Sequence, residues 1–203
     1  MNRLLVSWRT VGWQRARACW GLVWWVSLVS GAAWADDRPI DPSADSAMSE
    51  LRVKAAYLYK FGAFVQWPDR AFASAHAPVV IGVLDADMLA DELSMLIGGR
   101  SVQGRSLAVR RLRNGDSLAG IHMLFMGHPA DGRTAVWLAA ARGRPVLTVT
   151  DQAQPAVAGT MINFVHDGGR VRFDVFPKAA ERASLGISAR LLVVARRVEP
   201  GAP

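Results

Sequence analysis

The chain has 203 residues, of which 51% are hydrophobic and 20% charged, and its formal net charge is +7. This length suits one domain with a sizeable core. The arginines are scattered rather than gathered into a stripe, which argues against nucleic-acid binding, and the single cysteine, Cys19, cannot form an internal disulfide. Stability must therefore come from packing.

Residues 1–35 have the pattern of a secretory signal peptide. Four arginines and no acidic residue precede an apolar run, Cys19–Ser30, which is followed by the small-x-small site Ala33–Ala35. The run is shorter than the about 20 residues that span a bilayer. We therefore predict export to the periplasm with cleavage after Ala35, which leaves about 168 residues with a net charge of about +3. An uncleaved anchor and a start codon further downstream remain alternatives.

Residues 36–48 are polar and contain two prolines, which predicts a flexible N-terminus. A domain is predicted over 49–198. Its first element is a helix in the stretch Leu51–Pro68, LRVKAAYLYKFGAFVQWP, capped by Ser46 or Ser49 and stopped by its proline.

This predicted helix is amphipathic. Phe61 lies on a continuous arc of aromatic and aliphatic residues, and Lys60 lies on the opposite side. Lys54 projects from within the apolar arc, where an ammonium either reaches the helix end or meets an acid. A further interpretation is that this arc is partly exposed and receives a partner.

The remaining elements alternate between strands and helices. Apolar runs predict strands at Val79–Leu84, Ile121–Met126 and Val146–Val149, with Leu107–Arg113 nearer the edge of the sheet. Helices are predicted at Met88–Ile97, capped by Asp85 or Asp87, and at Arg133–Ala141. A hairpin, Thr160–Val165 and Arg170–Val175, precedes closing helices at Pro177–Leu185 and Ser188–Arg197.

These elements predict an α/β fold. We expect a single domain with a mostly parallel sheet, helices on both faces, a C-terminal antiparallel hairpin and two closing helices.

The sequence contains no catalytic motif, and we predict a protein that is not an enzyme and has no cofactor or metal. His122 and His128 bracket two methionines, an arrangement that could bind copper, but packing of the methionines in the core is the favoured interpretation. Asn163 lies in an apolar strand and needs a partner, either a neighbouring loop or a ligand. Asp174 is expected to pair with a basic residue such as Arg190.

Several segments in register resemble the YfiR-like family. They include VKAAYLYKFGAFVQWP (53–68), VVIGVLDAD (79–87), GTMINFVHDGGRVRFDV (159–175) and LGISARLLVVAR (185–196). The resemblance implies a periplasmic regulator that binds the periplasmic part of an inner-membrane diguanylate cyclase and represses it. Lys60 departs from the family pattern, which often has asparagine there, and the disulfides that support the best-known member are absent.

We therefore expect a regulator that binds the sensory region of a diguanylate cyclase and lowers cyclic di-GMP signalling. The candidate partner- or ligand-binding residues are Lys54, Lys60, Phe61, Asn163, Asp174 and Arg190. The alternative is a small-molecule-binding module with a crevice at the carboxyl ends of the strands, lined by Asp85, Asp87, Gly127 and Asp151. A homodimer is also left open.

Overall fold

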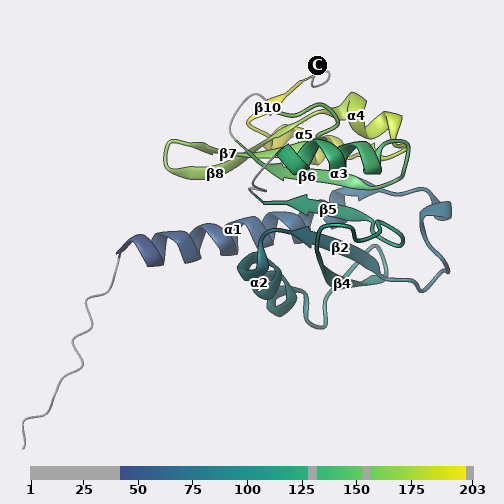
Figure 1. Ribbon diagram of the computed structural model, residues 1–203, viewed down its shortest axis with the longest axis horizontal. Coiled ribbons are helices and arrows are strands. Elements are labelled where there is room, and N and C mark those ends of the chain that lie inside the picture. The colour runs from purple at the N-terminus through teal and green to yellow at the C-terminus, as the bar shows by residue number, and fades with distance from the viewer. Residues whose placement is uncertain (1–41, 128–131, 153–155, 200–203) are drawn as a thin grey trace, which may run out of the picture. The chain divides into compact units, whose positions relative to one another are not determined.

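A sheet of eight strands, most of them parallel, organises the molecule (Figure 1). The computed structural model describes residues 42–127, 132–152 and 156–199, which belong to one compact unit. The helices in these ranges are α1 Pro42–Phe64, η1 Asp69–Ala71 (a 3-10 turn), α2 Asp87–Ile97, α3 Arg133–Ala141, α4 Pro177–Arg182 and α5 Ala189–Val194. The strands are β1 Val65–Gln66, β2 Val79–Leu84, β3 Ser101–Val102, β4 Arg105–Leu112, β5 Met123–Met126, β6 Leu147–Asp151, β7 Ile162–Asp167, β8 Arg170–Val175, β9 Gly186–Ile187 and β10 Arg197–Val198.

The strand order of the large sheet is β10-β8-β7-β6-β5-β2-β4-β3. The pairs β2–β4, β2–β5, β5–β6 and β6–β7 are parallel, whereas β7 and β8 form the predicted antiparallel hairpin. Its turn uses Gly168 and Gly169, which both have positive φ angles of 57° and 73°. The short strands β1 and β9 form a separate antiparallel pair. The predicted α/β class with a mostly parallel sheet is confirmed.

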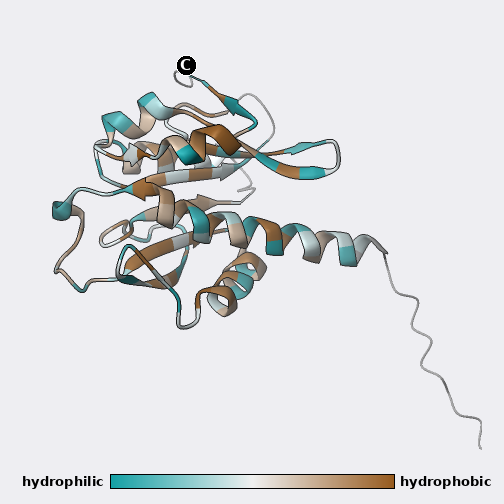
Figure 2. Cartoon of the chain, turned by 180° about the vertical axis from the view of Figure 1, so that it is seen from behind, coloured by the Kyte–Doolittle hydropathy of each residue, from teal (hydrophilic) through white to brown (hydrophobic). Residues whose placement is uncertain are grey.

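Helices cover both faces of the large sheet. Successive strand residues point to opposite faces, and the two faces belong to different hydrophobic clusters. The larger cluster joins α1, α2, α4 and α5 to one face, which is the side seen in Figure 2. The smaller cluster joins α3 to the other face through residues such as Trp137, Leu138, Leu124 and Met126.

The first helix differs from the prediction at both ends. It begins at Pro42 rather than near Ser46 or Ser49, so residues 42–48 form the first turns of this helix. Proline is compatible with a first helical turn because its missing N–H would have no partner there. The helix ends at Phe64, before Pro68, because Val65–Gln66 leave the helix to pair with β9.

Two smaller differences concern helix ends further along the chain. The N-cap of α2 is Ala86, without a side-chain cap, so neither Asp85 nor Asp87 caps this helix. The closing helix ends at Val194 because Arg197–Val198 form the edge strand β10 beside β8. Only α5, Ala189–Val194, is helical in the segment predicted as Ser188–Arg197.

Candidate functional site

The aromatic arc of α1 packs against the hairpin. Phe61 is fully buried, with ring centroids 5.8 Å from Phe164 on β7 and 5.1 Å from Phe173 on β8. Tyr57 adds a contact with Phe173 at 5.2 Å. Aromatic pairs at these separations stabilise a core beyond the area that they bury. The burial of Phe61 favours a structural role for this part of the helix.

Lys54 lies inside a network of acidic side chains. It is only 4% exposed, and its Nζ donates to Asp151 Oδ2 at 2.5 Å and to Glu50 Oε1. Glu50 also lies 3.1 Å from His166 Nε2 at the hairpin. Lys54 therefore meets acids rather than reaching the helix end, and the network joins α1, β6 and β7.

The pKa of Glu50 reflects this network. Partial burial alone raises the pKa, but hydrogen bonds from Lys54 and His166 outweigh burial, so the pKa lies below the ordinary value.

A row of polar side chains crosses the α3 face of the sheet. Thr150, Asn163 and Asp174 occupy matching register positions on β6, β7 and β8. Asn163 is fully buried and accepts a hydrogen bond from Thr150 Oγ1 at 2.6 Å. Its Nδ2 donates to the carbonyl of Gln152 at 3.1 Å. These bonds satisfy the buried amide and match the structural alternative predicted for it.

Asp174 forms a two-pronged ion pair with Arg196. The Nε–Oδ1 and Nη2–Oδ2 distances are 2.8 and 2.5 Å, and Asp174 is fully buried. The hydrogen bond to Asp174 raises the pKa of Arg196 above its ordinary value. Arg190, which the sequence suggested as the partner, makes no ion pair within the described part of the chain. The suggestion failed because Arg196 immediately precedes β10, which pairs with β8 beside Asp174.

Lys60 and Arg190 are the two candidate residues that face solvent. The structure does not bring them together with the four buried candidates, Lys54, Phe61, Asn163 and Asp174. Arg190 lies one helical turn before Val193 and Val194, so the three residues share one face of α5.

Exposed valines lie on α5 and on β10, the strand that follows it. Val193, Val194 and Val198 are 83%, 55% and 45% exposed. We call Arg190 with these three valines the α5–β10 surface. Figure 2 shows most of α5 in the colour of hydrophobic residues. These valines were not among the predicted site residues, although the run Leu191–Ala195 is apolar all round a helix, which was a usable signal.

At the carboxyl ends of the strands, the first two loops of the predicted crevice approach each other closely. A Cβ atom added at Gly127 would lie 2.7 Å from the carbonyl oxygen of Asp85, so the backbones touch there. Asp85 pairs with Arg133 at 3.5 Å, and Asp87 pairs with Arg113 at 2.8 Å. These acids are engaged with arginines of the same domain.

His122 is a structural histidine. Its Nδ1 accepts from the backbone N–H of Val80 at 3.1 Å, its Nε2 lies 3.1 Å from the carbonyl of Ala71, and its ring stacks on Phe72. Burial lowers its pKa, partly offset by the bond to Ala71. His128, the other histidine of the copper hypothesis, lies outside the described residues. Within those residues no group of three metal-ligating side chains occurs.

The described domain thus holds its buried charges in internal pairs and exposes valines on α5 and β10. The chain belongs to the YfiR/HmsC-like family, which matches residues 51–196. This confirms the family resemblance, and the family is one of periplasmic regulators of diguanylate cyclase signalling. No curated protein sequence matches the chain. Across the described ranges, no helix combines the length and hydrophobicity needed to cross a membrane.

Proposed function

We propose that this protein binds the periplasmic sensory region of an inner-membrane diguanylate cyclase and represses the enzyme. Binding would hold the receptor in its inactive conformation and so lower the output of cyclic di-GMP. Family membership supports a regulator of this signalling system. The periplasmic location rests on the same membership and on the predicted signal peptide.

The observation that carries the proposal is the α5–β10 surface. Three of the seven large hydrophobic side chains that are exposed in the described residues gather within Val193–Val198. Exposed apolar residues that gather on one part of a protein surface commonly mark contacts with other proteins. Arg190 shares the face of α5 that carries Val193 and Val194, which places one basic side chain beside the apolar residues. This arginine suits an acidic or polar group on the receptor.

The position of β10 at the edge of the sheet also supports a role in receptor binding. One side of this strand pairs with β8, and β10 is the last strand of the sheet on that side. An edge strand leaves backbone groups available to a strand of a partner. We therefore assign receptor binding to α5 and β10, with Lys54, Phe61, Asn163 and Asp174 supporting the domain behind them. Lys60, on the exposed side of α1, is a secondary candidate.

The test is co-purification with the periplasmic region of a diguanylate cyclase. We expect Val193→Asp and Val194→Asp to weaken binding at least about tenfold, because each places a charge among the exposed valines. Val136→Asp is the matched control, since Val136 is 68% exposed on α3. Cyclic di-GMP in cells carrying the two α5 variants should rise to the level of a deletion strain. If both variants bind and repress fully, receptor binding does not use the α5–β10 surface. If the wild-type protein does not bind and deletion leaves cyclic di-GMP unchanged, the proposed function itself is refuted.

A further inference from the structure

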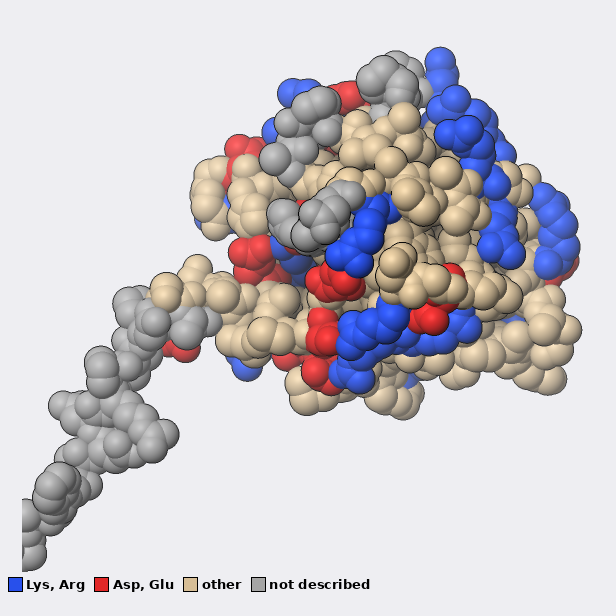
Figure 3. All heavy atoms as spheres, in the orientation of Figure 1, with Lys and Arg blue, Asp and Glu red and all other residues tan. Residues whose placement is uncertain are grey.

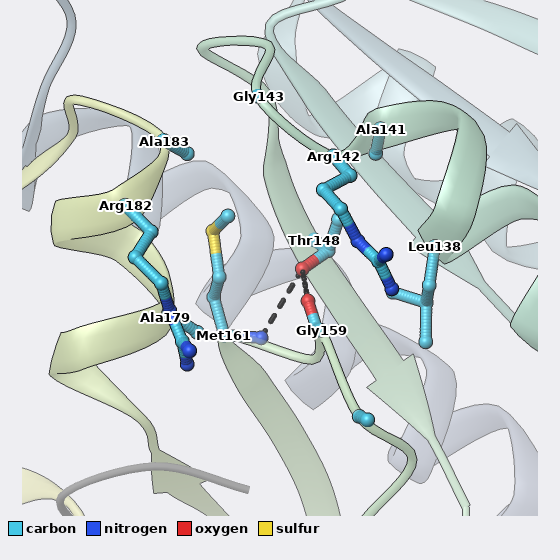
Figure 4. A pocket seen from close by; sticks show the side chains of 11 residues that line it. Leu138, Ala141, Arg142, Gly143, Thr148, Gly159, Met161, Ala179, Arg182 and Ala183 are labelled. Atoms are coloured by element: carbon cyan, nitrogen blue, oxygen red, sulfur yellow. Dashed lines mark hydrogen bonds between the residues drawn. The ribbon is translucent and has the colours of Figure 1, made fainter.

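A cavity of about 360 Å³ lies between the C-terminal ends of α3 and α4 (Figure 4). Thr148 at the start of β6, and Gly159 and Met161 just before β7, form its floor. The cavity therefore lies at the amino ends of these parallel strands, opposite to the crevice that the sequence predicts. Its volume falls within the range of about 300–1,000 Å³ that is usual for small-molecule sites.

The walls of the cavity are mainly apolar. Leu138 and Ala141 come from α3, Ala179 comes from α4, Ala183 directly follows α4, and Met161 lies between the two helices. Thr148 is the polar group of the floor, but its hydroxyl is already used. Its Oγ1 donates to the carbonyl of Gly159 at 2.8 Å and accepts from the N–H of Met161 at 3.1 Å. The threonine thus shapes the cavity, and polar recognition falls to other groups.

Two arginines supply those groups. Arg142 and Arg182 lie on opposite sides of the cavity, with Met161 and Thr148 between them (Figure 4). Neither guanidinium makes an ion pair within the described residues; Arg182 Nε donates only to the carbonyl of Lys178, at 3.2 Å. Figure 3 shows basic side chains gathered on the side where α3 and α4 end, with few acidic ones among them. Within the described ranges, two arginines without carboxylate partners therefore flank an apolar cavity.

We propose that this cavity binds a small organic anion, whose carboxylate or phosphate contacts Arg142 and Arg182 and whose apolar body packs on Met161 and Leu138. Planar guanidinium groups bind both kinds of anion in a two-pronged geometry. The helix ends present carbonyl groups equivalent to about half a negative charge each, which two full positive charges outweigh. The site is separate from the α5–β10 surface, so a failure of cyclase binding would leave this proposal standing.

The test is calorimetric titration of the purified protein with four probes. Phenyl phosphate and benzoate carry an anion on an apolar ring, benzamide has the ring without the charge, and inorganic phosphate has the charge without the ring. We expect phenyl phosphate or benzoate to bind at least about tenfold more tightly than benzamide and inorganic phosphate. Whichever of the two binds better identifies the anion as phosphate or carboxylate. Equal binding of benzamide would contradict the role of the arginines, and equal binding of inorganic phosphate would contradict the role of the apolar wall.

Variants test the location. Arg142→Gln and Arg182→Gln should each weaken binding of the better probe about tenfold. Arg144→Gln is the matched control, because Arg144 is exposed two residues away and does not line the cavity. Ala158→Trp should abolish binding, because Ala158 is an exposed lining residue whose enlargement fills the cavity without disturbing the core.

A purely structural role for the two arginines would appear differently. They would then only complement the helix ends, so their variants would shift the unfolding midpoint while the wild-type protein bound none of the probes. That result, or binding that survives both the arginine variants and Ala158→Trp, would overturn the proposal.

Discussion

Lys54 carries a full charge into the interior, where its side chain is only 5% exposed. The cost of removing an ammonium from water is large, and the attraction of Asp151 and Glu50 offsets it. Replacing one member of a buried ion pair costs more stability than the intact pair contributes, because the charge of the other member stays buried. The residue therefore stabilises the junction of α1 and β6 only as a member of its network.

We expect Lys54→Met to lower the free energy of unfolding by about 3 kcal/mol, measured by urea denaturation. Lys60→Met is the matched control on the same helix, and since Lys60 is exposed it should change stability by no more than about 0.5 kcal/mol. Adding Asp151→Asn to Lys54→Met should recover part of the loss, because it removes the charge of the buried carboxylate that faced the ammonium. Equal stabilities of the two single lysine variants would show that the buried ammonium contributes nothing.

At the scale of elements, the end of α1 is fixed by residues far away in the sequence. The last carbonyl groups of a helix have no partner within it. Gln103, in the turn between β3 and β4, donates from Nε2 to the carbonyls of Gly62 and Val65 at 3.0 and 2.7 Å. The N–H of Ser188 donates to the carbonyl of Phe64 at 2.9 Å. These bonds connect the end of α1 to the β3–β4 turn and to the residue that precedes α5.

Gln103→Ala should therefore destabilise the protein by about 1 kcal/mol, because it removes both hydrogen bonds from one side chain. Gln103 has a φ angle of 50°, so Gln103→Gly loses the same bonds but relieves the backbone and should cost less than the alanine variant. Gln66→Ala is the control, since this exposed glutamine makes no side-chain hydrogen bond within the described residues. An unchanged urea midpoint for Gln103→Ala would contradict the assignment.

Elements with a strong local pattern were predictable from sequence. The strand Val79–Leu84 and the helix Arg133–Ala141 have the predicted bounds, because a β-branched run and a helix closed by glycine are local signals. The end of α1 and strand β10 were not predictable, since they depend on pairing with residues 186–187 and 174–175.

The candidate site residues were also predictable only in part. The requirement that Lys54 and Asn163 find polar partners followed from sequence, but the identity of those partners required the fold. The cavity arginines, Arg142 and Arg182, come from two helices about forty residues apart in the chain, and no local pattern links them.

For the molecule as a whole, two groups make stability depend on pH. Burial lowers the pKa of His122, so below the ordinary histidine pKa the unfolded chain binds a proton that the folded chain excludes. The lowered pKa of Glu50 acts in the same direction at more acid pH, because its carboxylate is favoured in the folded state. Both contributions are fully present above the ordinary pKa of each group and are lost as the pH falls through the folded-state value.

We therefore expect the free energy of unfolding to fall in two stages on acidification, first below about pH 6.5 through His122 and then below the ordinary glutamate pKa through Glu50. Urea midpoints measured from neutral to acid pH provide the profile. His122→Gln should flatten the first stage and Glu50→Gln the second, whereas His76→Gln, at an exposed loop position, should leave both stages in place. The variants lose hydrogen bonds as well, so the slope with pH, and not the absolute stability, is the quantity to compare. A wild-type profile that rises on acidification, or a first stage that persists in His122→Gln, would contradict the assignment, because burial of a neutral imidazole requires the opposite sign.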